Sequence, residues 1–259
     1  MGSGEPTRAA KLDATYFDHW YADMAASPVR DAIVARTLGL PPELHSTSQL
    51  TWQGIAEVTE ALRMPQDGLL VDVACGRGGY GIEVARRTGV RLLGVDFSGV
   101  ALEQARLNSA RLLPAGRSEF RVGTLVATGL PAAVAEGLMC VDAVQFADPP
   151  LAALLEFRRL LASGARLVLS CWEAAEPRDE RVPSRIHAVN LQRDLPAAGF
   201  ADVQVHDKPE WREAERRMWL EALAAPAGSD AVRSLQDEGR RSLDTFGSVR
   251  RVFATATAP

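Results

Sequence analysis

The sequence predicts an α/β fold in which helices cover both faces of a mostly parallel sheet. Short apolar runs alternate with amphipathic segments of helical length through most of the chain. The run at residues 69–74 is apolar except for Asp72, as is typical of a strand buried on both faces. A glycine turn follows at residues 76–79 and leads into a helix, so the segment has the strand–turn–helix order of a βαβ unit.

The first part of the chain is expected to be helical. Aromatic and apolar residues recur at helical spacing in residues 13–21 and 29–40, and a Pro-Pro pair ends the second segment. Thr51 is placed to cap a further helix that continues to residue 63. These helices precede the first strand of the expected sheet.

From residue 69 onward the chain reads as alternating strands and helices. The expected strands lie at residues 69–74, 91–95, 120–122, 134–140, 166–172, 202–206 and 249–257. The expected helices lie at residues 80–87, 100–113, 151–161, 186–198 and 211–225. A charged loop is expected at residues 176–185, and an irregular link rich in Ser, Asp and Gly precedes the last strand.

Composition narrows the class of protein. The 259 residues are 47% hydrophobic and 24% charged, enough for a full core without cross-links. The net charge of −4 gives no basic surface for a nucleic acid. Cys75, Cys140 and Cys171 are far apart, so neither a disulfide framework nor a zinc site is indicated. No run of about 18 apolar residues or secretory signal occurs, and we expect a cytoplasmic protein with no membrane contact.

The glycine turn indicates a nucleotide-containing cofactor. Gly76, Gly78 and Gly81 satisfy the GxGxxG pattern, and Asp96 lies twenty residues after Gly76 at the end of the next strand. This is also the dinucleotide fingerprint, so an NAD(P)-linked oxidoreductase is one interpretation. Against it, Asp72 interrupts the strand, and Ala and Cys stand before the first glycine. The aromatic helices that precede the loop suit a lid over a small substrate.

The pattern Asp72-x-x-Cys-Gly-x-Gly, followed by Gly-Val-Asp96-Phe-Ser, resembles the class I S-adenosylmethionine-dependent methyltransferases. The resemblance covers residues 69–172 and is strongest to bacterial small-molecule enzymes of secondary metabolism. It implies a Rossmann-like, seven-stranded sheet with an N-terminal helical lid. Residues 1–64 would form the cap and residues 65–259 the cofactor-binding core, with residues 173–225 contributing to the acceptor pocket.

The resemblance also implies a set of cofactor-binding residues. Asp96 would accept hydrogen bonds from the ribose hydroxyls, and Phe97 would flank the adenine ring. Thr124 stands where the family often has an acidic residue, and Ala74 stands where it often has glycine. The full set of expected cofactor residues is Asp72, Ala74, Gly76, Gly78, Asp96, Phe97, Thr124, Leu125, Cys140, Gln145 and Tyr16.

Methyl transfer to a hydroxyl benefits from a base near the acceptor oxygen. His187, His45 and Glu173 are the candidate bases, together with Asp142. Glu173 ends an expected strand, and ligands bind at the carboxyl ends of strands in open α/β sheets. No cluster of metal ligands occurs, so no metal is expected.

These observations favour methylation of a small molecule, above all O-methylation of a hydroxyl or phenol in a bacterial natural-product pathway. The segment at residues 144–150 lacks the Asn-Pro-Pro-Tyr pattern of amide and nucleobase methylators, which argues against a nucleic-acid acceptor. An S-adenosylmethionine-binding cyclase or isomerase that transfers no methyl group is the alternative with the same fold. The expected partner is a small-molecule acceptor, and the expected oligomeric state is a monomer or a homodimer.

Overall fold

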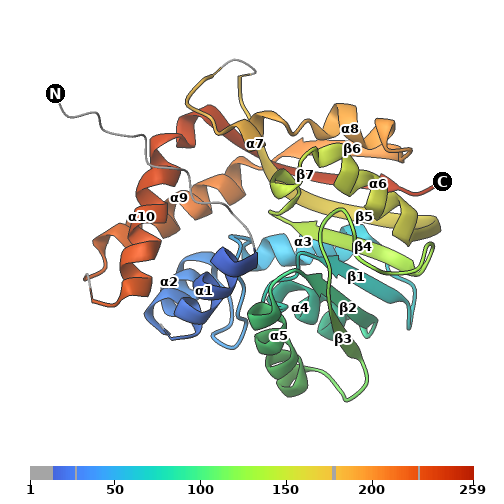
Figure 1. Cartoon of the computed structure of the whole chain (residues 1–259), viewed down its shortest axis with the longest axis horizontal. Coiled ribbons are helices and arrows are strands. Elements are labelled where there is room, and N and C mark those ends of the chain that lie inside the picture. The colour runs from blue at the N-terminus through green and yellow to red at the C-terminus, as the bar shows by residue number, and fades with distance from the viewer. Residues whose placement is uncertain (1–13, 27, 177–178, 227) are drawn as a thin grey trace.

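The computed structural model describes residues 14–26, 28–176, 179–226 and 228–259 (Figure 1). A single seven-stranded sheet, in the order β3-β2-β1-β4-β5-β7-β6, runs through these residues. The strands are β1 Leu69–Val73, β2 Arg91–Asp96, β3 Ser118–Val122, β4 Ala135–Val141, β5 Leu161–Ala174, β6 Ala201–Asp207 and β7 Val249–Thr257. Only β7 is antiparallel to its neighbours, so the predicted Rossmann-like, mostly parallel sheet is confirmed.

Ten α-helices occur in the described part of the chain. They are α1 Ala14–Ala25, α2 Pro28–Leu38, α3 Trp52–Leu62, α4 Gly79–Thr88, α5 Gly99–Leu112, α6 Pro150–Leu160, α7 Ser184–His187, α8 Leu191–Ala197, α9 Pro209–Ala224 and α10 Asp230–Asp244. Several begin at a polar cap. Thr51 accepts a hydrogen bond from the Gly54 amide at the start of α3, and Ser98 accepts one from the Ala101 amide at the start of α5.

The sheet is buried on both faces, as its apolar strands predict. Adjacent residues of one strand point to opposite faces, so Leu70 packs with α3, α4 and α5 while Val71 packs with α6 and α8. The strand order places β1 and β4 side by side at the centre of the sheet. From β1 the chain adds strands toward one edge of the sheet, and from β4 it adds them toward the other edge. A crevice outside the carboxyl ends of β1 and β4 is therefore the expected ligand site.

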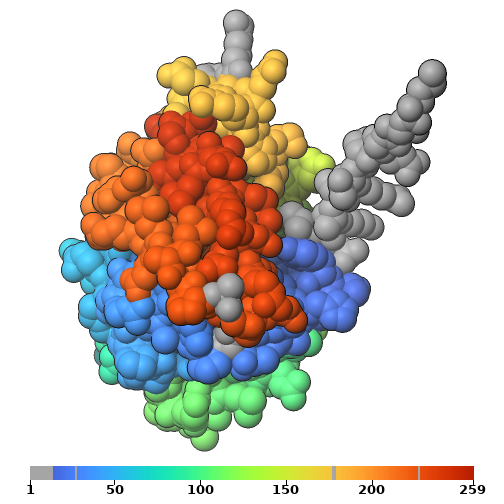
Figure 2. Space-filling model, turned by 90° about the vertical axis from the view of Figure 1, so that its left-hand side faces the viewer, coloured from blue at the N-terminus to red at the C-terminus, as the bar shows by residue number. Residues whose placement is uncertain are grey.

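Helices from both ends of the described chain form one cap beside the sheet. The cap consists of α1 and α2 together with α9 and α10, and these four helices contact one another. The Arg30 guanidinium of α2 lies 3.5 Å from the Glu238 carboxylate of α10, and Arg36 pairs with Glu221 of α9. Figure 2 shows α9 and α10 lying directly against the N-terminal helices.

Three expectations about the elements are corrected. The helix expected at residues 186–198 is two helices, because Asn190 leaves helical geometry and caps α8 through the Arg193 amide. The link expected before the last strand contains α10, which begins at the Ser229 cap. Strand β5 begins directly after α6, earlier than expected. The loop expected at residues 176–185 includes residues 177 and 178, which lie outside the described residues.

Candidate cofactor and acceptor site

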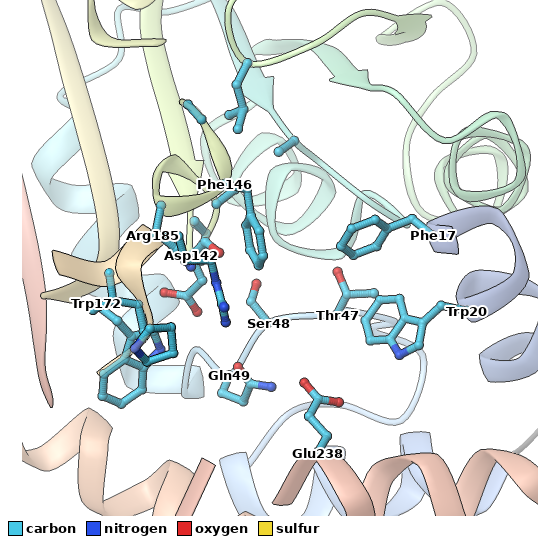
Figure 3. Close-up of a pocket in the computed structure, with 18 of the residues that line it drawn as sticks. Phe17, Trp20, Thr47, Ser48, Gln49, Asp142, Phe146, Trp172, Arg185 and Glu238 are labelled. Atoms are coloured by element: carbon cyan, nitrogen blue, oxygen red, sulfur yellow. Dashed lines mark hydrogen bonds between the residues drawn. The ribbon is translucent and has the colours of Figure 1, made fainter. Parts of the chain in front are cut away.

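A cavity of about 1510 Å³ opens at the carboxyl ends of the central strands, between the sheet and the cap. Its walls come from the loops after β1, β2 and β4, from α1 and the loop before α3, and from α9 and α10. Figure 3 shows Phe17 and Trp20 on one side of this space and Trp172 on the other. The volume is large enough for two small molecules side by side.

The glycine loop forms the floor of one half of the cavity. Gly76 and Gly78 have φ values of +53° and +78°, a backbone conformation that side chains rarely adopt. A Cβ atom at Gly76 would lie 2.8 Å from both Thr47 Oγ1 and Tyr21 Oη. The loop is therefore glycine-rich for two reasons: it turns sharply, and the cap packs directly onto it.

Asp96, at the end of β2, is tied to this loop. Its Oδ2 accepts a hydrogen bond from the Gly76 amide at 2.8 Å, and its Oδ1 accepts one from the Ser98 amide at 2.9 Å. Burial raises the pKa of the Asp96 carboxyl, and these amide hydrogen bonds oppose the rise. The result is a rigid, buried acceptor that lines the cavity.

Asp72 lies inside the same wall, on β1. Gly81 at the start of α4 comes so close that a Cβ there would lie 2.5 Å from Asp72 Oδ2. Burial, together with the nearby Asp96 carboxylate, raises the pKa of Asp72 to about 8. Both carboxyl groups of this wall therefore have pKa values above their ordinary range.

An aromatic cluster covers this half of the cavity. The Phe17 ring of α1 lies 5.3 Å from the Phe97 ring and 6.1 Å from the Phe146 ring, between ring centroids. Trp20 and Tyr21 extend the cluster along α1. Edge-on contacts of this kind leave flat apolar surface toward the cavity, which suits a planar heterocycle.

Two buried polar contacts hold the cap against the glycine loop. Arg77 of the loop donates two hydrogen bonds to the Asp31 carboxylate of α2, at 2.8 and 2.6 Å, and a third to the Ser46 carbonyl. The Tyr80 hydroxyl donates to the Ser48 carbonyl at 2.6 Å and accepts from the Leu50 amide. The loop before α3, which lines the cavity, is thereby fixed.

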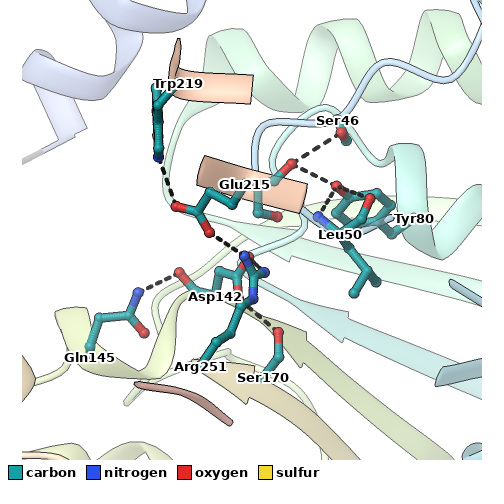
Figure 4. Close-up of polar contacts among 10 residues, drawn as sticks. Ser46, Leu50, Tyr80, Asp142, Gln145, Ser170, Glu215, Trp219 and Arg251 are labelled. Atoms are coloured by element: carbon teal, nitrogen blue, oxygen red, sulfur yellow. Dashed lines mark hydrogen bonds and ion pairs between the residues drawn. The ribbon is translucent and has the colours of Figure 1, made fainter. Parts of the chain in front are cut away.

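The other half of the cavity is built around a buried charge network (Figure 4). Arg251 of β7 is fully buried and pairs with both the Asp142 carboxylate after β4 and the Glu215 carboxylate of α9. The Trp219 Nε1 also donates to Glu215, at 3.0 Å, and the Ser170 hydroxyl donates to Asp142, at 2.7 Å. Asp142, Glu215 and Trp219 all line the cavity.

The structure brings most of the expected cofactor residues together. Those that line the cavity are Asp72, Ala74, Asp96, Phe97, Thr124, Leu125, Gln145 and Tyr16. Gly76 and Gly78 shape the loop without lining the cavity. Cys140 is corrected: its side chain is fully buried among the residues between the sheet and α6, so it does not reach the site.

The three candidate bases are also corrected, because none of them lines the cavity. His45 Nδ1 lies 3.2 Å from Oδ2 of Asp31, a residue of α2. His187 Nε2 lies within hydrogen-bond distance, 2.7 Å, of the Asp179 carbonyl. Glu173 accepts hydrogen bonds from the Leu191 amide and from Arg250. Of the four candidate bases considered from sequence, Asp142 alone lines the cavity.

Sequence reasoning missed the network residues Glu215 and Arg251. A signal exists for each. Glu215 lies midway between Trp211 and Trp219 at four-residue spacing, which places a carboxylate on the buried face of a helix. Arg251 follows Arg250 in a strand that otherwise consists of apolar residues and threonines. Buried ionisable groups of this kind need a partner, and their presence points to a paired network.

The described residues contain neither a cluster of metal ligands nor a membrane-spanning helix. No group of three or more His, Cys, Asp or Glu side chains is arranged to hold a metal ion in the part of the chain that the structure describes. Within the same residues, no helix has the length and apolar character needed to cross a bilayer.

Comparison with known proteins identifies the domain type. Residues 71–169 match the methyltransferase domain family. An O-methyltransferase of Aspergillus sclerotiorum is 24% identical over 149 residues, 53% of this chain and 56% of that protein. The chain spans between 54% and 64% of the length of the curated relatives it matches.

Solved structures share the fold at low sequence identity. The phosphoethanolamine N-methyltransferase 2 of Haemonchus contortus, in complex with S-adenosyl-L-methionine, superposes with a TM-score of 0.72 at 17% identity, over 98% of this chain and 62% of that one. The [4+2]-cyclase SpnF superposes with a TM-score of 0.67 at 18% identity, over 92% of this chain and 95% of that one. The same fold thus carries different chemistry in these proteins.

Proposed function

The chain carries a class I S-adenosylmethionine-dependent methyltransferase domain, and from that premise we propose that the protein transfers the cofactor's methyl group to a small-molecule acceptor. One observation carries the proposal: a single cavity joins the glycine loop and Asp96 to a second, aromatic half with room for an acceptor. When bound, the cofactor supplies an electrophilic methyl group on a sulfonium, and the protein's part is alignment and exclusion of water.

The residues of the first half fit this cofactor. Asp96 offers a fixed carboxylate to ribose hydroxyls, and Phe97 offers an aromatic face to adenine. The Gln145 side-chain oxygen is buried and has no hydrogen-bond partner among the described residues, while its amide donates to the Asp142 carbonyl at 2.7 Å. An unsatisfied acceptor in this position suits the ammonium group of the cofactor's amino-acid tail.

The second half supports an aromatic hydroxyl compound as acceptor. The residues that line it include Trp172, Trp219 and Phe246, and the ring centroids of Trp172 and Phe246 lie 6.0 Å apart. Flat apolar walls with a carboxylate among them favour a phenol over a wholly apolar acceptor. O-methylation is therefore the finer proposal, in the natural-product setting expected from sequence. Residues 173–225 contribute Trp219 and Glu215 to this half, as proposed for the acceptor pocket.

The test is calorimetric titration of the purified protein with S-adenosylhomocysteine and, separately, with NAD(H). We expect micromolar binding of S-adenosylhomocysteine and none of NAD(H). Radiolabelled S-adenosylmethionine is then incubated with a panel of phenols, and transfer of label to a phenol is expected. Binding of NAD(H) alone would reject the cofactor assignment. Binding of S-adenosylhomocysteine without methyl transfer to any acceptor class would instead favour the non-transferring alternative.

A further inference from the structure

The network of Asp142, Arg251 and Glu215 holds one more carboxylate than it has cations. Arg251 is fully buried, and its guanidinium lies between the two acids and pairs with both of them. If both acids are ionised, the network carries a net charge of −1. If one is protonated, the network is neutral. A buried group that can exist in either state is suited to take up a proton.

Glu215 is the member of the network placed to do so. Both its oxygens are oriented, one by the Trp219 Nε1 at 3.0 Å and the other by Arg251. Both acids line the cavity and each has two partners, but Glu215 lies on the same helix as Trp219 of the acceptor half, whereas Asp142 follows β4. Through Arg251, Glu215 is linked to Asp142 at the carboxyl end of β4, where the two halves of the cavity meet.

We propose that the Glu215 carboxylate accepts the proton of the acceptor hydroxyl during methyl transfer, and that Arg251 is the positioning residue that holds it at the cavity wall. The inference rests on the proposed function. The bond between sulfur and the methyl carbon breaks, with its electron pair staying on sulfur. A new bond forms between the acceptor oxygen and the methyl carbon, and the hydroxyl proton moves to Glu215. The positive charge of the sulfonium and the negative charge of Glu215 both disappear.

Electrostatics agree with this role. Burial, together with the nearby Asp142, raises the pKa of Glu215 to about 7 despite the opposing effect of Arg251. The charged and titratable groups around it are Arg251 of β7, Asp142 after β4 and, through Arg251, Tyr80 of α4. Glu238 and Arg241 of the neighbouring helix α10 also line the cavity. Arg30 of α2 pairs with Glu238. A proton acceptor works best when its pKa lies near the working pH.

The experiment compares Glu215→Gln with Glu213→Gln, a matched control on the same helix whose side chain is half exposed and pairs with Arg216. Turnover is measured with labelled S-adenosylmethionine on phenols of increasing acidity, from pH 5.5 to 9. We expect kcat to fall about 10²–10⁴-fold in Glu215→Gln and to stay unchanged in the control. The deficit shrinks with more acidic phenols, because a phenolate needs no proton acceptor. Wild-type activity rises with pH through about 7, and this rise is absent in Glu215→Gln.

Two further measurements keep the outcomes distinct. Titration with S-adenosylhomocysteine is run on all variants, and equal affinity shows that the cofactor half is intact. Glu215→Asp retains a carboxylate, so we expect partial activity and a retained pH dependence even if the Gln variant folds poorly. Equal turnover of Glu215→Gln and its control, or S-adenosylhomocysteine binding without methylation of any phenol, would overturn the inference. Failure of the wild type to bind S-adenosylhomocysteine would instead overturn the proposed function.

Discussion

The Asp96 carboxylate accepts a hydrogen bond from the Gly76 amide at 2.8 Å, so the end of β2 and the loop after β1 hold each other in place. The twenty-residue spacing between the two residues is the length of one helix and one strand. Because β1 and β2 are parallel neighbours, that spacing returns the chain to the same edge of the sheet. The acceptor that we assign to the ribose is thus fixed by the loop that it helps to shape.

Replacing Asp96 by Asn tests this assignment. An amide oxygen accepts hydrogen bonds without a negative charge, and its NH₂ group faces the hydroxyls or the Gly76 amide as a second donor. We expect the affinity for S-adenosylhomocysteine to fall about 10–100-fold, measured by calorimetry. Glu119→Gln on β3, an exposed acid paired with Arg121, is the control and retains wild-type affinity. Wild-type affinity in Asp96→Asn would remove Asp96 from the binding site.

Gly76→Ala and Gly89→Ala separate backbone strain from close packing. Both glycines have positive φ, +53° and +73°, so each substitution costs about 1–2 kcal/mol in strain. Only at Gly76 does the new Cβ meet the cap, because nothing lies within 4 Å of a Cβ at Gly89. We expect denaturant unfolding to show a larger loss in the free energy of unfolding for Gly76→Ala than for Gly89→Ala. We expect weaker binding of S-adenosylhomocysteine for Gly76→Ala alone. Equal losses in both measurements would contradict a close contact between loop and cap.

Asp31→Asn tests the attachment of the cap. It leaves the Arg77 guanidinium buried without its charged partner, and we expect a loss of about 3–5 kcal/mol in the free energy of unfolding. Burial alone would raise the pKa of Asp31, but the hydrogen bonds from Arg77 and His45 lower it below its ordinary value. The contribution of the pair is therefore present at neutral pH and is lost as the pH falls through the acid range.

The control for Asp31→Asn is Asp237→Asn on α10, whose side chain is 60% exposed and pairs with Arg240. A solvent-exposed pair contributes at most about 1 kcal/mol, so we expect little change in the free energy of unfolding. If the two variants lose the same stability, the contact between Arg77 and Asp31 does not anchor the cap.

Asp72→Asn tests the pH dependence of stability. The folded-state pKa of Asp72, about 8, lies above the ordinary value, so the protonated form is favoured in the fold. Its contribution to stability is fully present below about pH 4 and is lost as the pH rises through 8. The Asn variant cannot ionise. We therefore expect the difference in the free energy of unfolding between Asp72→Asn and the wild type to grow, in favour of the variant, by a few kcal/mol from pH 5.5 to 8.5, measured by denaturant unfolding. A constant difference between the two proteins across this range would show that Asp72 does not titrate there.

The central strands were predictable from sequence because each is a local apolar run between turn residues. The runs at β1 and β2 are long enough to be buried on both faces, and the structure confirms both. Helix α10 was missed because polar and charged residues dominate its sequence. Its buried stripe at Val232, Leu235 and Gly239 becomes clear only when α9 is present to cover it.

The cofactor half of the site could be predicted for the same local reason. Gly76 and Asp96 belong to one βαβ unit, so their spacing in sequence encodes their contact. The acceptor half could not, because Asp142, Glu215 and Arg251 come from three distant segments. No spacing rule connects them. The strand order β4-β5-β7 brings Asp142 close to Arg251, and the packing of α9 against β7 adds Glu215.

The position of β7 bears on how the protein is made. This strand, the last in the chain order, inserts between β5 and β6, and the helix before it closes the cap against α1 and α2. During synthesis the chain emerges from its amino end, so α1 and the glycine loop are complete before α9, α10 and β7 exist. We therefore expect the nascent chain to expose the β5 edge and the acceptor half of the cavity until β7 leaves the ribosome. Ligand binding in the acceptor half becomes possible only after β7 has emerged.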